Sequence, residues 1–392
     1  MVILRPGNNM NGSRAAAPLN NRKIVRAWYM YDWANSVYSL VITSAIFPVY
    51  YKAVARTNGS DEVAFLGYLI RNSSLYSYAL SFSFLIVAAI LPLLSGVADY
   101  TGNKKTFMKI FVFIGGFSCM GLFFFRDINT LEWGIFCSVL ASIGYSSSLV
   151  FYDAFLPEIV SEDRYDRTSA KGYSMGYYGS VILMILCLVL ILGYETFGFS
   201  DEGEATRFSF ILVGAWWIGF SVIPFVFLPD NPYNRDATGN IWTKGYEEIM
   251  KVWNSLSLQH DLKRFLAAFF FYNMGVQTVM YLAALFGTDV LHLESGKLIQ
   301  TVLAIQLVGS VGAWFFARLS GRKGNRFSLM VMITIWFFIC VASYFITNEF
   351  QFYGLACVVG LVMGGIQALS RATYSKLIPQ KTIDPTSYFI FY

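Results

Sequence analysis

Long apolar runs separated by short polar connections make up most of the chain. A helix needs about 20 residues to cross a hydrocarbon layer about 30 Å thick, because each helical residue advances about 1.5 Å. About ten runs reach that length with few charged residues. They are residues 25–51, 73–94, 106–125, 131–156, 172–194, 208–228, 265–288, 298–319, 327–347 and 352–378. Hydrocarbon cannot satisfy open backbone groups, and strands of a membrane barrel would alternate polar and apolar positions. The pattern therefore predicts an all-α polytopic membrane protein.

The composition excludes the other broad classes. Charged residues make up 14% of the 392 residues, and the mean hydropathy is +0.52. A soluble chain of this length needs more charge to cover its surface, and a disordered chain would not carry 18% aromatic residues. The five cysteines lie inside apolar runs without paired spacing, so nothing indicates a disulfide framework. We expect no metal site and no cofactor.

Basic residues predict how the chain is oriented. Cytoplasmic segments of membrane proteins carry an excess of Lys and Arg. If the N-terminus is cytoplasmic, 23 of the 29 Lys and Arg residues fall on the cytoplasmic side. The exceptions are Lys52, Arg56, Arg71, Arg126, Arg207 and Lys297. This distribution predicts a multi-pass protein of the cell (inner) membrane with a cytoplasmic N-terminus, and it explains the net charge of +5 without a nucleic-acid partner.

The spans divide the chain into four segments. They are a cytoplasmic tail (residues 1–24), an N-terminal six-helix bundle (25–228), a cytoplasmic linker (229–264) and an incomplete C-terminal bundle (265–392). Five apolar residues of the linker recur at helical spacing and predict an amphipathic helix at the membrane interface, either a simple linker or a partner-binding helix. They are Tyr246, Ile249, Met250, Trp253 and Leu256.

A weak internal repeat relates the two bundles. Residues 99–105 (DYTGNKK) align with residues 321–326 (GRKGNR), and residues 155–157 (FLP) align with residues 377–379 (LIP) at the same offset. Two further spans follow the first FLP site, whereas only a short segment follows the second. The repeat therefore predicts a chain truncated or frameshifted before its last two spans, with a genuine ten-span protein as the alternative.

Several motifs resemble those of a known transporter family. Residues 95–105 (SGVADYTGNKK) resemble the loop signature between the second and third spans of the major facilitator superfamily. Residues 28–36 (WYMYDWANS) look like the opening motif of the vacuole-effluxer-like family within it. Four further segments are similar to later signatures of that family. They are residues 151–157 (FYDAFLP), 171–179 (KGYSMGYYG), 271–278 (FYNMGVQT) and 370–371 (SR).

The resemblance runs from about Arg26 to the C-terminus. It implies the major facilitator fold, two pseudo-repeated six-helix bundles that give alternating access, and amino-acid efflux for the eukaryotic members. Ser95 and Gly321 depart from the superfamily pattern, which has Gly and Asp there. Without the Asp, the second loop is expected to lack the corresponding charge interaction.

Polar residues inside the spans mark the expected cavity. Polar side chains are costly against lipid, so lipid-facing helices should carry few of them. The third, sixth and ninth spans carry the fewest, whereas the first, fourth, seventh and tenth carry the most. In the resembled architecture these four helices line the cavity. The candidates for substrate binding or coupling are Tyr31, Asp32, Trp33, Asn35, Tyr152, Asn273, Gln277, Gln367 and Arg371.

Asp32 requires a cation or a proton at its depth in the first span. It could bind a substrate amine or carry a coupling proton through a pKa raised by desolvation. The structural alternative is that it pairs with Arg26 or fixes helix contacts. Asp153 lies near the cytoplasmic mouth of the fourth span, and Arg371 lies slightly deeper in the tenth. We hypothesise a gate in which Asp153 and Arg371 form a salt bridge that breaks as the cavity opens inward. The alternative is a static charge, or a pairing with the loop that contains Asp99.

The loop after the second span is a candidate latch that docks on neighbouring helix ends in the outward-open state. Its residues are Asp99, Gly102, Lys104 and Lys105, and Gly102 permits the tight turn. The alternative is that the two lysines only set topology. Separately, Gly172, Gly176 and Gly179 form a small-residue stripe that predicts close helix packing.

These observations favour a secondary active transporter of a small solute, with protons as the candidate coupling ion and lipid as its surroundings. We expect a monomer. A receptor or scaffold without transport activity is one alternative. A membrane-embedded enzyme is the other, but only His260 and His292 are present and no nucleophile, metal or nucleotide motif appears, so we predict that the protein is not an enzyme.

Overall fold

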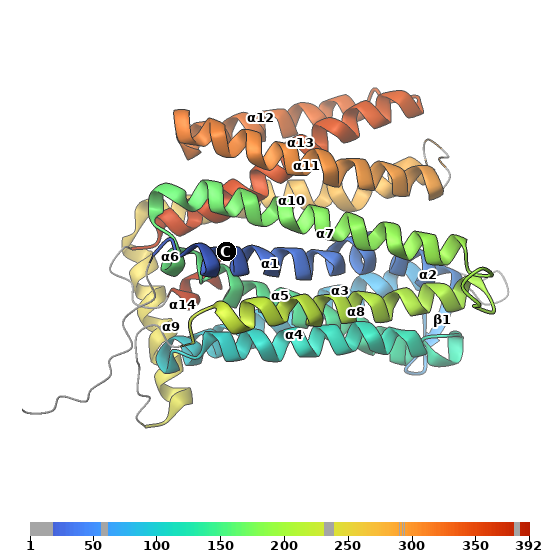
Figure 1. Ribbon diagram of the computed structural model, residues 1–392, viewed down its shortest axis with the longest axis horizontal. Coiled ribbons are helices and arrows are strands. Elements are labelled where there is room, and N and C mark those ends of the chain that lie inside the picture. The colour runs from blue at the N-terminus through green and yellow to red at the C-terminus, as the bar shows by residue number, and fades with distance from the viewer. Residues whose placement is uncertain are drawn as a thin grey trace, which may run out of the picture.

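Long helices run side by side through the molecule (Figure 1). The computed structural model describes residues 19–55, 62–230, 239–289, 291, 293, 295–379 and 385–392. The first half holds α1 (Arg22–Val37), α2 (Ile46–Val54), α3 (Asn72–Thr101), α4 (Lys104–Gly121), α5 (Leu131–Asp153), α6 (Leu156–Ile159), α7 (Tyr165–Leu192) and α8 (Glu202–Phe227). The rest holds α9 (Ile241–Leu258), α10 (His260–Asp289), α11 (Ser295–Lys323), α12 (Asn325–Ser343), α13 (Glu349–Leu377) and α14 (Thr386–Phe389).

Nine helices among the described residues are long and apolar enough to cross a membrane. They coincide with nine of the predicted spans. The first is a continuous span over residues 22–54, in which a π-helical segment (Tyr38–Ala45) joins α1 to α2. The remaining predicted span, residues 265–288, lies within the 30-residue α10, of which some side chains fall outside the described part of the chain. The predicted polytopic helical class is confirmed.

One small hairpin departs from the all-α prediction. Strands β1 (Glu62–Phe65) and β2 (Tyr68–Arg71) pair antiparallel between the first span and α3. Leu66 and Gly67 form its turn with φ of 49° and 84°. Two residues with positive φ are the geometry of a tight hairpin turn, and glycine adopts it at little cost. The segment is too short to have shown a strand pattern in the sequence.

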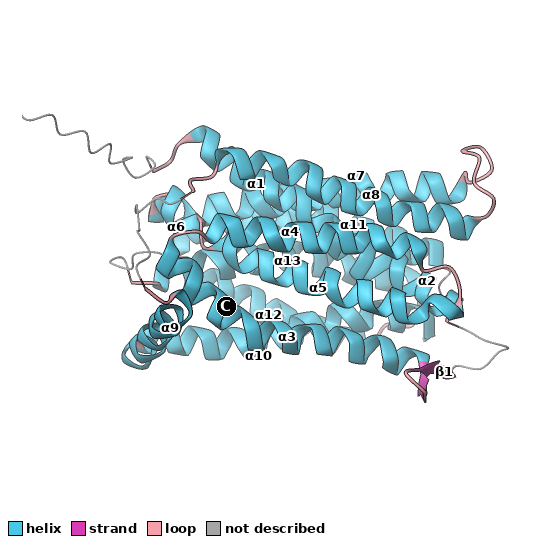
Figure 2. Cartoon of the chain, turned by 90° about the horizontal axis from the view of Figure 1, so that it is seen from below, coloured by secondary structure: helices cyan, strands magenta, loops and turns pink. Residues whose placement is uncertain are grey.

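Helix α9 lies across the ends of the long helices (Figure 2). We refer to this end of the bundle as the α9 end. Gly245 packs directly on Val97 of α3, because a Cβ at Gly245 would come within 2.6 Å of the Val97 side chain. Leu256 is buried, whereas Tyr246 and Trp253 are exposed. The predicted amphipathic helix therefore exists, but its apolar residues divide between a face packed on the bundle and an exposed face.

Glycines bring α7 against α1. A Cβ at Gly172, Gly176 or Gly179 would lie 2.1, 2.3 and 2.7 Å from atoms of Asp32, Ser36 and Trp33 respectively. Such distances are far below van der Waals contact, so only glycine allows the two backbones to approach this closely. This stripe places the backbone of α7 next to the Asp32 side chain.

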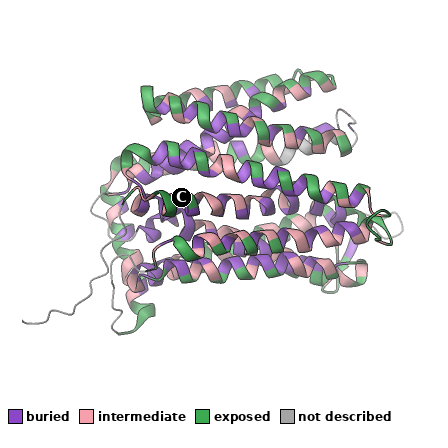
Figure 3. Ribbon diagram, viewed as in Figure 1, coloured by how far each residue is buried: buried purple, intermediate pink, exposed green. Residues whose placement is uncertain are grey.

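Helix α12 has the exposure pattern expected of a lipid-facing span. It buries Leu329, Met332 and Trp336 at helical spacing, while Phe337 and Phe338 are exposed. Exposed residues accordingly alternate with buried ones along this outer helix (Figure 3). Large apolar side chains exposed on a spanning helix suit contact with acyl chains, as predicted for the ninth span.

Candidate functional site

A buried guanidinium joins the two halves of the molecule at the α9 end. Arg371 of α13 is 1% exposed. Its Nη2 donates to Oδ2 of Asp32 on α1 at 3.1 Å, and its Nη1 donates to Oδ1 of Asp153 on α5 at 3.0 Å. Its Nε donates to Oγ of Ser169 on α7 at 2.9 Å. A buried arginine requires hydrogen-bond acceptors on several sides of its planar guanidinium group, and these oxygens provide them. We call Arg371, Asp32, Asp153 and Ser169 the Arg371 cluster.

Aromatic rings enclose this cluster. The guanidinium carbon lies 4.7, 5.5 and 4.2 Å from the ring centroids of Trp28, Tyr152 and Tyr173. The Tyr152 hydroxyl donates to Oδ2 of Asp32 at 2.6 Å. The rings exclude water and add cation–π attraction, which strengthens the ion pairs.

The Arg371 cluster carries an uneven charge. One guanidinium faces the carboxylates of Asp32 and Asp153, so two negative groups share one positive group. Burial of the excess negative charge is costly. The arrangement is therefore chemically suited to bind a proton or another cation in one of its states.

The structure changes one sequence expectation for these residues. The Asp153–Arg371 ion pair is present, as the gate hypothesis requires. Asp32 also pairs with Arg371, and not with Arg26 as the structural alternative proposed. The physical reason is that α13 packs against α7 and brings Arg371 between two carboxylates, whereas Arg26 lies exposed on α1.

A cavity of about 630 Å³ lies between the halves, next to the Arg371 cluster. Tyr173 contacts Arg371 on one side and lines this cavity on the other. From Tyr173 and Gln367 the cavity extends away from the α9 end to Phe286, Leu298 and Ile346. The described lining residues offer hydroxyl and amide groups but no charged side chain. They include Ser36, Ser39, Tyr145, Ser146, Ser180 and Thr301.

The candidate residues fall into separate environments. Gln277 and Gln367 line the cavity, and Gln367 accepts a hydrogen bond from the Tyr177 hydroxyl at 2.6 Å. Tyr31 packs on Tyr152 with ring centroids 4.6 Å apart. Trp33 instead stacks on Trp216 of α8, with centroids 5.5 Å apart. The structure does not bring Tyr31, Trp33, Asn35 or Asn273 into the described lining of the cavity.

Four site residues were missed by reading the sequence. Trp28 stands one helical turn before Asp32, so the two share a face of α1. Ser169, Tyr173 and Tyr177 recur every fourth residue and share a face of α7. That spacing was a usable signal. It did not stand out because serine and tyrosine are common along the whole chain.

The predicted latch residues join several helix ends. Gly102 ends α3 with φ 69°, a left-handed conformation that glycine adopts without strain. Lys104 is buried and pairs with Glu158, and Lys105 donates to the carbonyl of Leu228 at 2.7 Å. Asp99 accepts hydrogen bonds from the backbone N–H groups of Thr386 and Ser387 at 3.1 and 2.6 Å. The loop thus holds the first turn of α14 against α3.

A second charged network crosses the halves at the α9 end. Asp166 at the start of α7 pairs with Lys376 of α13 at 2.8 Å. It also accepts hydrogen bonds from Ser320 and Asn325, which flank the second repeat loop, at 2.7 and 2.8 Å. The second loop lacks its own Asp, as Gly321 indicated, but a carboxylate from the other half stands beside it. Reading the repeat alone could not reveal this partner.

Two helical halves with a polar cavity between them, joined at one end by buried ion pairs, define a polytopic membrane protein of the transporter class. Residues 20–392 match the model of the family described as vacuole effluxer Atg22 like. The MFS-type transporter YxiO of Bacillus subtilis (strain 168) is 34% identical over 368 residues, covering 93% of this chain and 83% of that protein. The chain therefore belongs to the vacuole effluxer Atg22-like family of major facilitator transporters.

More distant proteins are also similar to this chain. Autophagy-related protein 22-1 of Emericella nidulans is 23% identical, covering 92% of this chain and 80% of that protein. The solved proton:xylose symporter XylE, a major facilitator superfamily protein, matches with a TM-score of 0.65 at 12% identity. The match covers 94% of this chain and 85% of XylE. At that identity the likeness establishes the fold alone, and the predicted major facilitator fold is confirmed.

Proposed function

We propose that the protein is a secondary active transporter that moves a small polar solute across the cell membrane by alternating access. The observation that carries this proposal is the position of the Arg371 cluster. It closes the α9 end of a cavity that extends toward the opposite end. Because the cluster is built from both halves, a rocking motion that opens the α9 end must break it.

The distribution of basic residues supports a cytoplasmic location for this closed end. With that orientation the arrangement is an outward-open one, in which the Asp99 loop acts as the latch. Hydroxyl and amide groups along the cavity suit a polar solute of no net charge, and an amino-acid zwitterion is one such solute. The excess carboxylate of the Arg371 cluster is the candidate proton carrier. When a proton binds there, the ion pairs weaken and the cluster can open.

Solute counterflow in liposomes tests this proposal. We expect purified protein to accumulate a labelled neutral amino acid or sugar when the lumen is preloaded with the same unlabelled solute. Gln367→Ala and Gln277→Ala, which alter the cavity lining, should weaken the apparent affinity. Tyr344→Ala is the matched control, because Tyr344 is exposed and lies outside the described cavity lining. Absence of counterflow across a panel of such solutes would favour the receptor or scaffold alternative.

Loss of the Asp99 carboxylate should favour opening at the α9 end. In Asp99→Ala the N–H groups of Thr386 and Ser387 lose their acceptor, and we expect the free energy of unfolding to fall by about 1–2 kcal/mol. Asp127→Ala is the control, since Asp127 accepts two N–H bonds in the same way but within the first half, at 2.9 and 3.2 Å. Both variants should lose similar stability in denaturation experiments. Only Asp99→Ala should change the counterflow rate, and an equal change in both would contradict the latch.

A further inference from the structure

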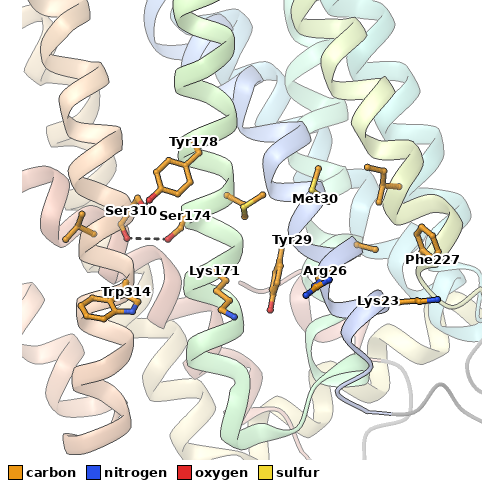
Figure 4. A pocket seen from close by; sticks show the side chains of 14 residues that line it. Lys23, Arg26, Tyr29, Met30, Lys171, Ser174, Tyr178, Phe227, Ser310 and Trp314 are labelled. Carbon is orange, nitrogen blue, oxygen red and sulfur yellow. Dashed lines mark hydrogen bonds between the residues drawn. The ribbon is translucent and has the colours of Figure 1, made fainter.

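A second cavity, of about 940 Å³, lies on the outside of the bundle between α1, α7, α8 and α11 (Figure 4). Its described walls are mostly apolar. They include Met30, Met175, Ile223, Phe227, Val311 and Trp314. Phe227, Val311 and Trp314 are exposed. On a spanning bundle such a groove faces the acyl chains of the membrane.

One end of this groove is strongly basic. Arg26 of α1 and Lys171 of α7 lie at that end on either side of the Tyr29 ring, and Lys23 of α1 lies beyond Arg26, beside Phe227 (Figure 4). The Lys171 Nζ stands 5.9 Å from the Tyr29 ring centroid. All three charged side chains are exposed, and the described structure gives none of them an acidic partner. The groove therefore has an apolar body and an uncompensated positive end.

Helical spacing explains this convergence. Lys23, Arg26 and Met30 recur at intervals of three and four on α1, so they share one face. Lys171, Ser174 and Tyr178 do the same on α7. The excess of Lys and Arg in cytoplasmic segments accounts for basic residues on one side of the membrane, but it does not require them to lie at the end of an apolar groove.

The start of α1 adds a second electrostatic reason. Its first turn contains Arg22 and Lys23 and no acidic residue. The N-terminal end of a helix carries partial positive charge, so cations there are unfavourable and an anion is stabilised. Asn21 caps this end by accepting a hydrogen bond from the Lys23 N–H at 2.9 Å, so the uncompensated charge comes from the Lys23 and Arg26 side chains and the helix end together.

We infer that this groove is a binding site for an anionic phospholipid. The phosphate lies between Arg26 and Lys171, Lys23 adds positive charge at the same end, and the acyl chains lie along the apolar walls toward Tyr178 and Val311. Helix α11 belongs to the second half, whereas α1, α7 and α8 belong to the first. One lipid therefore touches both halves beside the hydrogen bonds that join Ser310 to Ser174 and Tyr178. This inference does not depend on the solute that the central cavity binds.

Native mass spectrometry of the purified full chain, titrated with phosphatidylglycerol or phosphatidylcholine, tests the site. We expect retention of one phosphatidylglycerol at concentrations where phosphatidylcholine is lost. Each basic group near an anionic headgroup contributes a factor of about five in affinity. The variant Lys23→Gln/Arg26→Gln/Lys171→Gln should therefore bind about a hundredfold more weakly.

A charge-matched control separates this site from general attraction. Arg322→Gln/Lys323→Gln/Arg326→Gln removes three exposed charges at the α9 end, away from the groove. It should retain phosphatidylglycerol like the wild type. Equal losses in the two triple variants, or equal retention of the two lipids by the wild type, would overturn the proposal.

Two further arms distinguish a lipid from free phosphate. Val311→Trp fills the exposed apolar wall without a charge change and should reduce lipid retention. Inorganic phosphate and glycerophosphoglycerol, which lack acyl chains, should not displace the lipid at millimolar concentration. Displacement by either one, with full retention by Val311→Trp, would show an anion site and overturn the lipid assignment. Thermal unfolding of each variant establishes that it is folded.

Discussion

Arg371→Gln should produce the largest loss of stability of any single substitution discussed for this protein. It leaves the buried carboxylates of Asp32 and Asp153 facing each other without a cation. Removing one partner of a buried ion pair costs about 3–5 kcal/mol, because the remaining charge stays desolvated. We expect a correspondingly lower denaturation midpoint in detergent micelles and no measurable counterflow.

A triple variant provides the sharper comparison. Arg371→Gln/Asp32→Asn/Asp153→Asn removes all three charges and should recover most of the lost stability, while transport stays impaired. Lys251→Gln is the control, since its pair with Glu248 lies on the exposed surface of α9 and should contribute less than about 1 kcal/mol. If Arg371→Gln were as stable as Lys251→Gln, the cluster would not hold the halves together.

The cluster also changes how the gate should be tested. Exchange of the two charges between positions 153 and 371 would be a natural rescue experiment for a simple pair. Here it would place a carboxylate at position 371 beside Asp32. We therefore expect the exchanged variant to remain inactive unless Asp32→Asn is added.

Gly172→Ala should have the second largest effect, through shape and not charge. The added Cβ would lie 2.1 Å from Oδ2 of Asp32 and 2.9 Å from Nη2 of Arg371. Alanine stabilises an ordinary helix by about 1 kcal/mol relative to glycine, but forced repacking of a tight interface costs about 1–3 kcal/mol. We expect a net loss of stability and at least tenfold slower counterflow, because the cluster cannot close.

Gly219→Ala on α8 is the matched control for this prediction. A Cβ there would meet nothing within 4 Å, so only the higher helix propensity of alanine should affect the stability. Its denaturation midpoint should stay the same or rise slightly, with unchanged counterflow. Wild-type behaviour of Gly172→Ala would show that α1 and α7 can separate without consequence, and would remove the argument that their contact shapes the site.

Individual residues show how far sequence reasoning reached. Asp32, Asp153 and Arg371 were identifiable as candidates because a charge inside an apolar run is costly and therefore conspicuous. Ser169 and Tyr173 contact the same guanidinium, yet neither is conspicuous in an apolar helix. Trp33 lies next to Asp32 in the chain, but adjacent helical residues point in different directions, and it faces α8 instead. The partner of Asp166 in the second half could not be deduced from either repeat.

The sequence by itself determined the membrane spans, their orientation as a prediction from basic residues, and the family, because these depend on local hydrophobicity, charge and short motifs. The tertiary structure alone decided which charges meet. Arg371 and Asp32 are 339 positions apart, and their contact depends on glycines that let α7 approach α1 and on the packing of α13 between the halves. Hydrophobic periodicity specifies which face of each helix is buried, but the same faces are compatible with many pairings. Packing at ångström scale selects one of them, and with it the closed end of the cavity.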